Sequence, residues 1–340
     1  MITDIDEAEF SPCETPGAEP GVASSKWVVL RFAGGDLVPF ESWRVLAAVA
    51  RNRLREGLRP LIVHSAAGVS QDTESILRAA VLGDATKQIA SLRDSYRKLA
   101  AGLEFDRGRD ADRRLADYFA EIEALAAEVR RLREVSPRIH TRMLVLGELM
   151  STRLGAAFLN SNGIEADWVD ALELQNIADL SSPLTVGQHG LSGNVDLSPD
   201  PALSERLATC KGVVLTQARV AGHPDGGPPL PGPAGSDTTA AYLAARLPAR
   251  RLEIWAGVAG IYTADPQLVP SARLLKELNF DEALELSASG SQAVSPSCLA
   301  LSRRSGIPVF VRCTSAPQIA GTVISTVTND NEPQIKGVST

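Results

Sequence analysis

Residues that could bind a ligand follow an apolar run near the amino end of the sequence. The run Lys26–Phe32 leads directly into a turn that contains Gly34 and Gly35. A buried strand that ends in a glycine turn is a common start of an α/β nucleotide-binding domain. The residue type and the spacing therefore predict a ligand site at the end of this first strand.

Two further stretches place polar side chains in a similar setting. The run Arg59–His64 is predicted as a second strand and leads into the small-residue loop Ser65–Ser70. His64 ends this strand, so it lies either in the ligand pocket or in a buried position with its polar atoms satisfied. Ser236 and Asp237 follow a loop rich in Gly and Pro, and they suit the cap and first turn of a helix.

The elements that would position these residues alternate along the chain. Residues between Ser75 and Glu134 are rich in Ala, Leu and Arg and predict at least two long amphipathic helices. The apolar stretch Met143–Leu146 is predicted as a strand, with a helix continuing through Leu159. Further strands are predicted at Glu165–Val169, Lys211–Thr216, Arg251–Trp255 and Pro308–Val311, and further helices at Ser42–Glu56, Phe280–Ser287 and Pro296–Ser305.

This alternation predicts an α/β fold, a three-layer α/β/α sandwich with a mainly parallel central sheet. Folds of this kind bind ligands at the carboxyl ends of their strands. Glycine-rich loops follow several of the predicted strands in this sequence, which predicts ligand binding at these ends.

The overall composition excludes several classes of protein. The net charge of −7 argues against a general nucleic-acid-binding protein, because neutralising phosphates needs a basic face. The four cysteines are scattered without a paired motif, so no disulfide framework or metal site is predicted. No apolar run is long enough for a membrane helix and no secretory signal is recognisable, which favours a cytoplasmic protein.

Several segments together resemble one family, the aspartokinases of the amino-acid-kinase (carbamate-kinase-like) fold. The resemblance spans roughly residues 26–326 and rests on the order and spacing of its segments. These segments are Gly147-Glu148-Leu149-Met150-Ser151, Val214-Leu215-Thr216-Gln217, Gly235-Ser236-Asp237-Thr238-Thr239-Ala240-Ala241 and Gly260-Ile261-Tyr262-Thr263-Ala264-Asp265-Pro266.

The resemblance implies a domain over residues 26–327, with a substrate-side lobe at 26–210 and a nucleotide-side lobe at 211–327. Residues 1–25 and 328–340 are predicted as tails, and no regulatory ACT module is expected. Members of the family use ATP and Mg²⁺ to phosphorylate the carboxylate of an acidic amino acid. The expected partners are thus a small carboxylate or amino acid and, by analogy, a second copy of the chain in a homodimer.

The resemblance also assigns roles to individual residues. It implies catalytic roles for Arg31 and Asp237. It implies substrate-binding roles for Ser70, Glu148 and Ser236, to which His64 is added as a pocket candidate. It implies nucleotide-binding roles for Gly34, Gly35, Tyr262 and Asp265.

The chain departs from the family pattern at several of its charged positions. Arg31 stands where the family has a lysine, and Pro233 stands where it has an arginine that pairs with the substrate carboxylate. Gln267 and Gln292 replace an arginine and a lysine near the phosphates, and Ser295 replaces a histidine. These changes alter both the substrate side and the nucleotide side.

Three interpretations follow from these departures. The main one is a homologue repurposed for another small-molecule ligand or reaction in a specialised biosynthetic pathway, in which ordinary transfer from ATP to aspartate is doubtful. A second is a non-catalytic pseudokinase that acts as a scaffold or partner subunit. The third is a working kinase in which Arg31 replaces the lysine, and Arg219 or Arg153 replaces the lost arginine.

Overall fold

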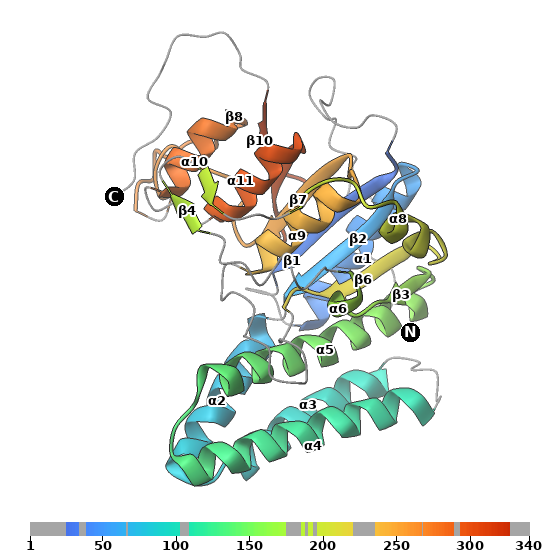
Figure 1. Ribbon diagram of the computed structural model, residues 1–340, viewed down its shortest axis with the longest axis vertical. Coiled ribbons are helices and arrows are strands. Elements are labelled where there is room, and N and C mark those ends of the chain that lie inside the picture. Colours follow the sequence, from blue (N-terminus) through green and yellow to red (C-terminus); the bar gives the residue numbers. More distant parts are fainter. Residues whose placement is uncertain are drawn as a thin grey trace.

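The computed structural model describes residues 25–33, 39–65, 67–102, 109–174, 185–187, 190–192, 196–219, 235–266, 268–288 and 293–326. Within these ranges an eight-stranded sheet crosses the centre of the molecule in the order β3-β6-β2-β1-β7-β9-β10-β8 (Figure 1). Its strands are β1 (Trp27–Ala33), β2 (Arg59–Ser65), β3 (Ala166–Trp168), β6 (Val213–Gln217), β7 (Arg251–Ala256), β8 (Glu277–Asn279), β9 (Val309–Cys313) and β10 (Thr322–Ser325).

Most neighbouring strands run parallel, as the sequence predicts. Strand β1 lies at the centre and pairs in parallel with β2 on one side and β7 on the other. The parallel order continues to β6 and β3 beyond β2, and to β9 beyond β7. Only the pairing of β10 with β9 is antiparallel among these described strands.

Helices cover both faces of this sheet because alternate residues of its central strands point to opposite sides. Val28 and Leu30 of β1 belong to one buried apolar cluster, whereas Val29 belongs to the other. The first cluster includes residues of α1 (Pro39–Arg55), α2 (Ala67–Leu82) and α5 (Pro137–Ser161). The second includes residues of α8 (Pro201–Ala208), α9 (Gly235–Arg246), α10 (Phe280–Ala288) and α11 (Pro296–Ser305), which confirms the three-layer sandwich.

An additional helical unit stands outside these layers. Helices α3 (Thr86–Gly102) and α4 (Arg109–Leu132) run side by side below α5, on the side of α5 away from the sheet (Figure 1). They are the long amphipathic helices predicted for this region. The remaining described elements are the short helix α6 (Ala171–Leu174) and the hairpin of β4 (Thr185–Gly187) and β5 (Gly190–Ser192). No described helix has the length and apolar character needed to cross a membrane.

Two predicted elements are wrong. Met143–Leu146 is not a strand but lies within α5, which begins at Pro137, where Ser136 caps it by accepting a hydrogen bond from the Ile139 amide. A run of four apolar residues fits a buried helix as well as a strand, and here the run packs among other helices. The predicted loop Ser65–Ser70 is also shorter, because α2 already begins at Ala67.

Candidate functional site

The predicted site forms around Arg31, near the carboxyl end of β1. Its guanidinium donates from Nε and Nη2 to the Ser236 hydroxyl, at 3.2 and 2.9 Å. Asp237 Oδ1 lies 2.7 Å from Arg31 Nε in an ion pair that lacks hydrogen-bond geometry. Ser236 and Asp237 occupy the first turn of α9, so a central strand and a helix amino end meet at one cation.

Asp237 also connects this cation to a second helix. Its Oδ2 accepts a hydrogen bond of 3.0 Å from the backbone amide of Ser295. Ser295 in turn caps α11, since its hydroxyl accepts from the Cys298 amide. The carboxylate is therefore fixed from two directions, and it holds the Arg31 guanidinium in one orientation.

Glu148 projects from the middle of α5 and is almost fully buried, with 1% exposure. Its Oε1 accepts from Arg219 Nη1 at 2.6 Å, and its Oε2 accepts from the Arg219 backbone amide at 2.7 Å. Burial raises the pKa of the Glu148 carboxyl, and the charge and hydrogen bonds of Arg219 partly oppose this rise. Arg219 follows β6, and the sequence already suggested it as a replacement for the lost arginine.

His64 lies near the carboxyl end of β2 and is buried, with 3% exposure. Its ring stacks on Trp43 at 4.5 Å between centroids, and its Nδ1 has no hydrogen-bond partner among the described residues. Burial, and next the positive charge of Arg31, lower the pKa of His64 to about 3. The imidazole is therefore neutral at physiological pH. It is buried, but its unpartnered Nδ1 does not match the satisfied position that was the structural alternative, so its role stays a prediction.

This depressed pKa makes a prediction about acid stability. The pKa of His64 rises from about 3 in the folded protein to 6.5 in the unfolded one, so the unfolded chain binds the extra proton and stability falls as pH drops below 6.5. Between pH 7 and pH 5 the expected loss from this group is about 2 kcal/mol. Urea unfolding at both pH values should show a smaller loss in the variant His64→Phe. An equal loss in both proteins would contradict the prediction.

Backbone contacts connect the elements that carry the separate pairs. The carbonyl of His64 accepts from the Ala218 amide at 3.1 Å, and the carbonyl of Ala218 accepts from the Thr239 hydroxyl at 3.0 Å. Ala218 directly precedes Arg219. These two hydrogen bonds therefore connect β2 and α9 to the segment that follows β6 and carries Arg219. The structure thus forms two groups of predicted residues, Arg31 with Ser236 and Asp237, and Glu148 with Arg219. The binding and catalytic roles of these residues stay predictions.

The other predicted residues are less informative. Tyr262 follows β7, is half-buried and forms an isolated antiparallel bridge with Leu274, whereas Asp265 is exposed on the same loop. Gly34 and Gly35 lie outside the described residues, as do Pro233 and Gln292. Ser70 lies in α2, but its side chain is outside the described part.

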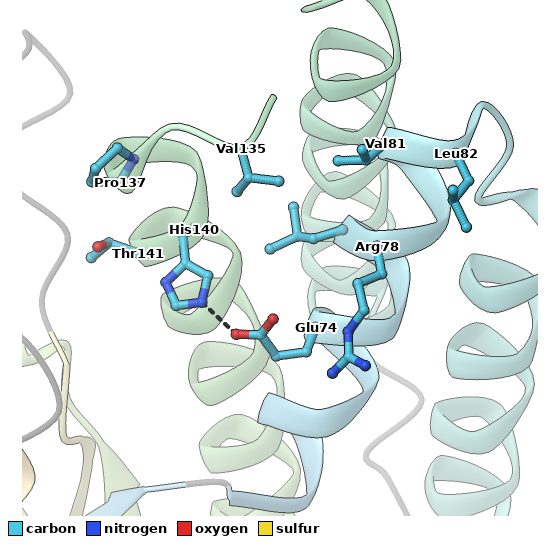
Figure 2. A pocket seen from close by; sticks show the side chains of 9 residues that line it. Glu74, Arg78, Val81, Leu82, Val135, Pro137, His140 and Thr141 are labelled. Atoms are coloured by element: carbon cyan, nitrogen blue, oxygen red, sulfur yellow. Dashed lines mark hydrogen bonds and ion pairs between the residues drawn. The ribbon is translucent and has the colours of Figure 1, made fainter. Parts of the chain in front are cut away.

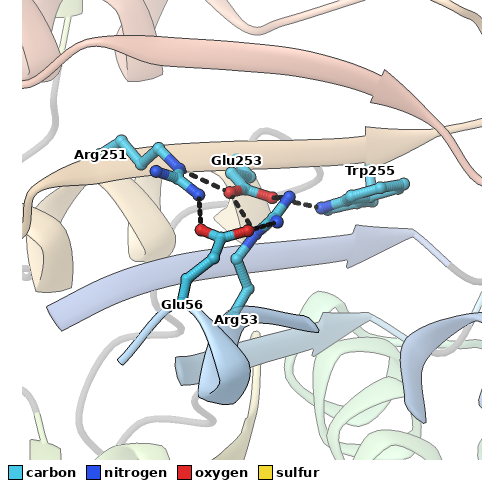
Figure 3. A network of polar contacts seen from close by, with 5 residues as sticks. All are labelled: Arg53, Glu56, Arg251, Glu253 and Trp255. Carbon is cyan, nitrogen blue, oxygen red and sulfur yellow. Dashed lines mark hydrogen bonds and ion pairs between the residues drawn. The ribbon is translucent and has the colours of Figure 1, made fainter. Parts of the chain in front are cut away.

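A second buried charge cluster, between β7 and the end of α1, includes none of the residues predicted from the sequence. Glu253 of β7 is fully buried and accepts from Arg53 Nε at 2.8 Å, from Arg251 Nε at 2.7 Å and from Trp255 Nε1 at 3.0 Å (Figure 3). Glu56 contacts both arginines from the end of α1. The signal was present, because Arg251, Glu253 and Trp255 alternate and must share one face of their strand.

A cavity of about 710 Å³ lies away from the predicted site, between α2 and the start of α5 (Figure 2). Its wall is mostly apolar, with Leu77 and Val81 among the lining residues, and Glu74 contacts His140 at its edge. It contains none of the predicted site residues.

Comparisons with known proteins agree with the observed fold. Residues 26–313 match the amino acid kinase family. Lysine-sensitive aspartokinase 3 of Escherichia coli is 28% identical over 93% of this chain and 67% of its own length. An aspartokinase of Schizosaccharomyces pombe is 30% identical over 88% of this chain and 59% of its own length.

Solved structures give the same result. The crystal structure of Escherichia coli aspartokinase III in complex with aspartate and ADP superposes with a TM-score of 0.70 at 27% identity. The superposition covers 89% of this chain and 65% of the Escherichia coli chain. The chain thus spans about two thirds or less of the length of these relatives. The family match over most of the chain and the shared fold show that this protein belongs to the amino acid kinase family.

Proposed function

We propose that the chain is an ATP-dependent kinase that transfers a phosphoryl group to the carboxylate of aspartate or a related small acid. Of the three interpretations open from the sequence, the working kinase with Arg31 in place of lysine has the best support. Two relatives named aspartokinase match along 93% and 88% of the chain. The observation that carries the proposal is the fixed guanidinium of Arg31 at the amino end of α9.

Arg31 is suited to stabilise a transferring phosphoryl group. Phosphoryl transfer depends mainly on positioning and on neutralising negative charge. The Arg31 side chain retains 15% exposure while Ser236 and Asp237 hold it. The amino end of α9 adds the positive end of a helix dipole at the same place. The neutral His64 on the neighbouring strand β2 adds no competing charge.

The residues present fit a nucleotide phosphate better than a dedicated metal cage. The described residues contain no group of three or more His, Cys, Asp or Glu side chains that could hold a metal ion. Mg²⁺ commonly binds through substrate phosphates, water and one or two carboxylates, so such a cage is not required. When bound, Mg²⁺ would neutralise charge on the β- and γ-phosphates. The proposal also includes the division of the domain into a substrate-side lobe at residues 26–210 and a nucleotide-side lobe at residues 211–327.

The proposed reaction is a single displacement. A carboxylate oxygen of the acceptor attacks the γ-phosphorus of ATP, and the bond from that phosphorus to the oxygen of the β-phosphate breaks. The products are an acyl phosphate and ADP, and no proton needs to leave an ionised acceptor. Arg31 would bind the non-bridging oxygens of the transferring group and orient them for attack.

Calorimetric titration of Mg-ATP into the purified chain tests the nucleotide site. We expect binding with a dissociation constant in the micromolar to low-millimolar range. Hydroxylamine should then trap an acyl phosphate as a hydroxamate when ATP and a carboxylate acceptor are both present. Absence of Mg-ATP binding at millimolar concentration would refute the kinase and favour the pseudokinase interpretation. As a control, the variant Arg303→Gln alters an exposed arginine that pairs with Asp281 of α10, and it should bind Mg-ATP as the parent chain does.

A further inference from the structure

The buried acid of the site is already neutralised by the protein itself. Both oxygens of Glu148 accept hydrogen bonds from Arg219, one from the guanidinium and one from the backbone amide. The Glu148 side chain has 1% exposure, whereas the Arg219 side chain has 23%. A ligand that enters this part of the site therefore meets a guanidinium before it meets a carboxylate.

This arrangement disfavours a ligand with an ammonium group next to Arg219. An ammonium could reach Glu148 only by displacing a buried 2.6 Å ion pair, or by adding a second positive charge beside the guanidinium. The other carboxylate of the site, Asp237, is held by Arg31 and by the Ser295 amide. Neither described carboxylate is thus available to an ammonium without rearrangement.

A carboxylate ligand can instead bind the guanidinium donors that Glu148 leaves free, without displacing the ion pair. A guanidinium carries five N–H donors in a planar fork that matches a carboxylate, and one nitrogen on Glu148 does not exhaust them. Glu148 fixes Arg219 at its backbone amide and at the guanidinium Nη1, which reduces the entropy lost when a ligand binds. Arg219 is therefore oriented for a second anion.

We propose that Arg219 makes the acceptor of this kinase a small dicarboxylic acid that lacks an α-ammonium group. Arg219 holds the carboxylate that does not react, and the other carboxylate receives the phosphoryl group. This inference rests on the proposed kinase function and specifies its substrate class. Arg219 is the specificity-determining residue, and Glu148 acts through it as a positioning residue.

Direct binding of succinate and L-aspartate tests the proposal. The two acids differ only by the α-ammonium group, and calorimetry of the full chain is done with and without Mg-ADP. We expect succinate to bind at least tenfold more tightly than aspartate. Equal affinity, or tighter binding of aspartate, would overturn the inference. If Mg-ATP fails to bind, the kinase function fails, but the preference measured without nucleotide still decides this inference.

A variant provides a second, independent readout. Arg219→Gln removes the guanidinium and frees the Glu148 carboxylate, so succinate binding should weaken at least tenfold and the preference should move toward aspartate. Arg219→Lys should retain part of the succinate affinity, and the control Arg303→Gln should leave both affinities unchanged. An unchanged preference ratio in folded Arg219→Gln, with folding checked by circular dichroism, would exclude Arg219 as the selecting residue.

Discussion

Replacing Glu253 with alanine is expected to lower the free energy of unfolding by about 3–5 kcal/mol, because the change removes the anion that neutralises buried arginines. Glu253 is fully buried and contacts Arg53 and Arg251 at 2.7–2.8 Å. Burial alone would raise the pKa of Glu253, but the charges of Arg53, Arg251 and Arg312 outweigh burial and hold the pKa well below its ordinary value. Chemical unfolding in urea at neutral pH measures the loss.

Matched variants separate the buried charge from the loss of side-chain volume. Glu56→Ala removes the more exposed carboxylate of the same cluster, so its expected cost is about 1 kcal/mol or less. The double variant Arg251→Met with Glu253→Leu removes charges of both signs and should be more stable than Glu253→Ala alone. If Glu253→Ala unfolds at the same urea concentration as the parent protein, the buried cluster does not stabilise the fold.

Sequence patterns predicted the fold more completely than the contacts within it. The strands Lys26–Phe32 and Arg59–His64 were predictable because buried parallel strands are continuous apolar runs. Met143–Leu146 was not, since four apolar residues do not distinguish a strand from one part of a long helix. The helix became clear only with its cap at Ser136, more than one turn before the apolar run.

In the site, too, the positions of residues in the elements were predictable, whereas their partners were not. Ser236 and Asp237 were predicted as a helix start, and the structure confirms it and places them on Arg31. Arg219 was one of two arginines suggested as replacements, and a linear sequence cannot show which one faces Glu148. The other, Arg153, instead lies 3.6 Å from the centroid of the Trp168 ring. Such pairings depend on the packing of α5 against β3 and β6, which arises from residues far apart in the sequence.

Replacing Arg31 with methionine is expected to reduce the turnover of ATP by about a thousandfold or more, in line with arginines that neutralise a transferring phosphoryl group. Methionine keeps much of the apolar stem but removes the cation, and Asp237 would keep its hydrogen bond from the Ser295 amide. Formation of ADP in a coupled assay measures the effect. The variant Arg31→Lys keeps a positive charge at this position, so it should retain a large part of the rate that Arg31→Met loses.

The ratio of effects on turnover and on acceptor binding decides how Arg31 acts. If Arg31 binds the transferring group, Arg31→Met should lower kcat strongly and leave the affinity for the carboxylate acceptor nearly unchanged. Arg219→Gln should show the reverse pattern, with a raised KM for the acceptor. The two arginines lie at the ends of different strands and hold different carboxylates, Asp237 and Glu148. Turnover of Arg31→Met within tenfold of the parent protein would therefore exclude the phosphoryl-binding role and move the transfer step to a cation elsewhere in the chain.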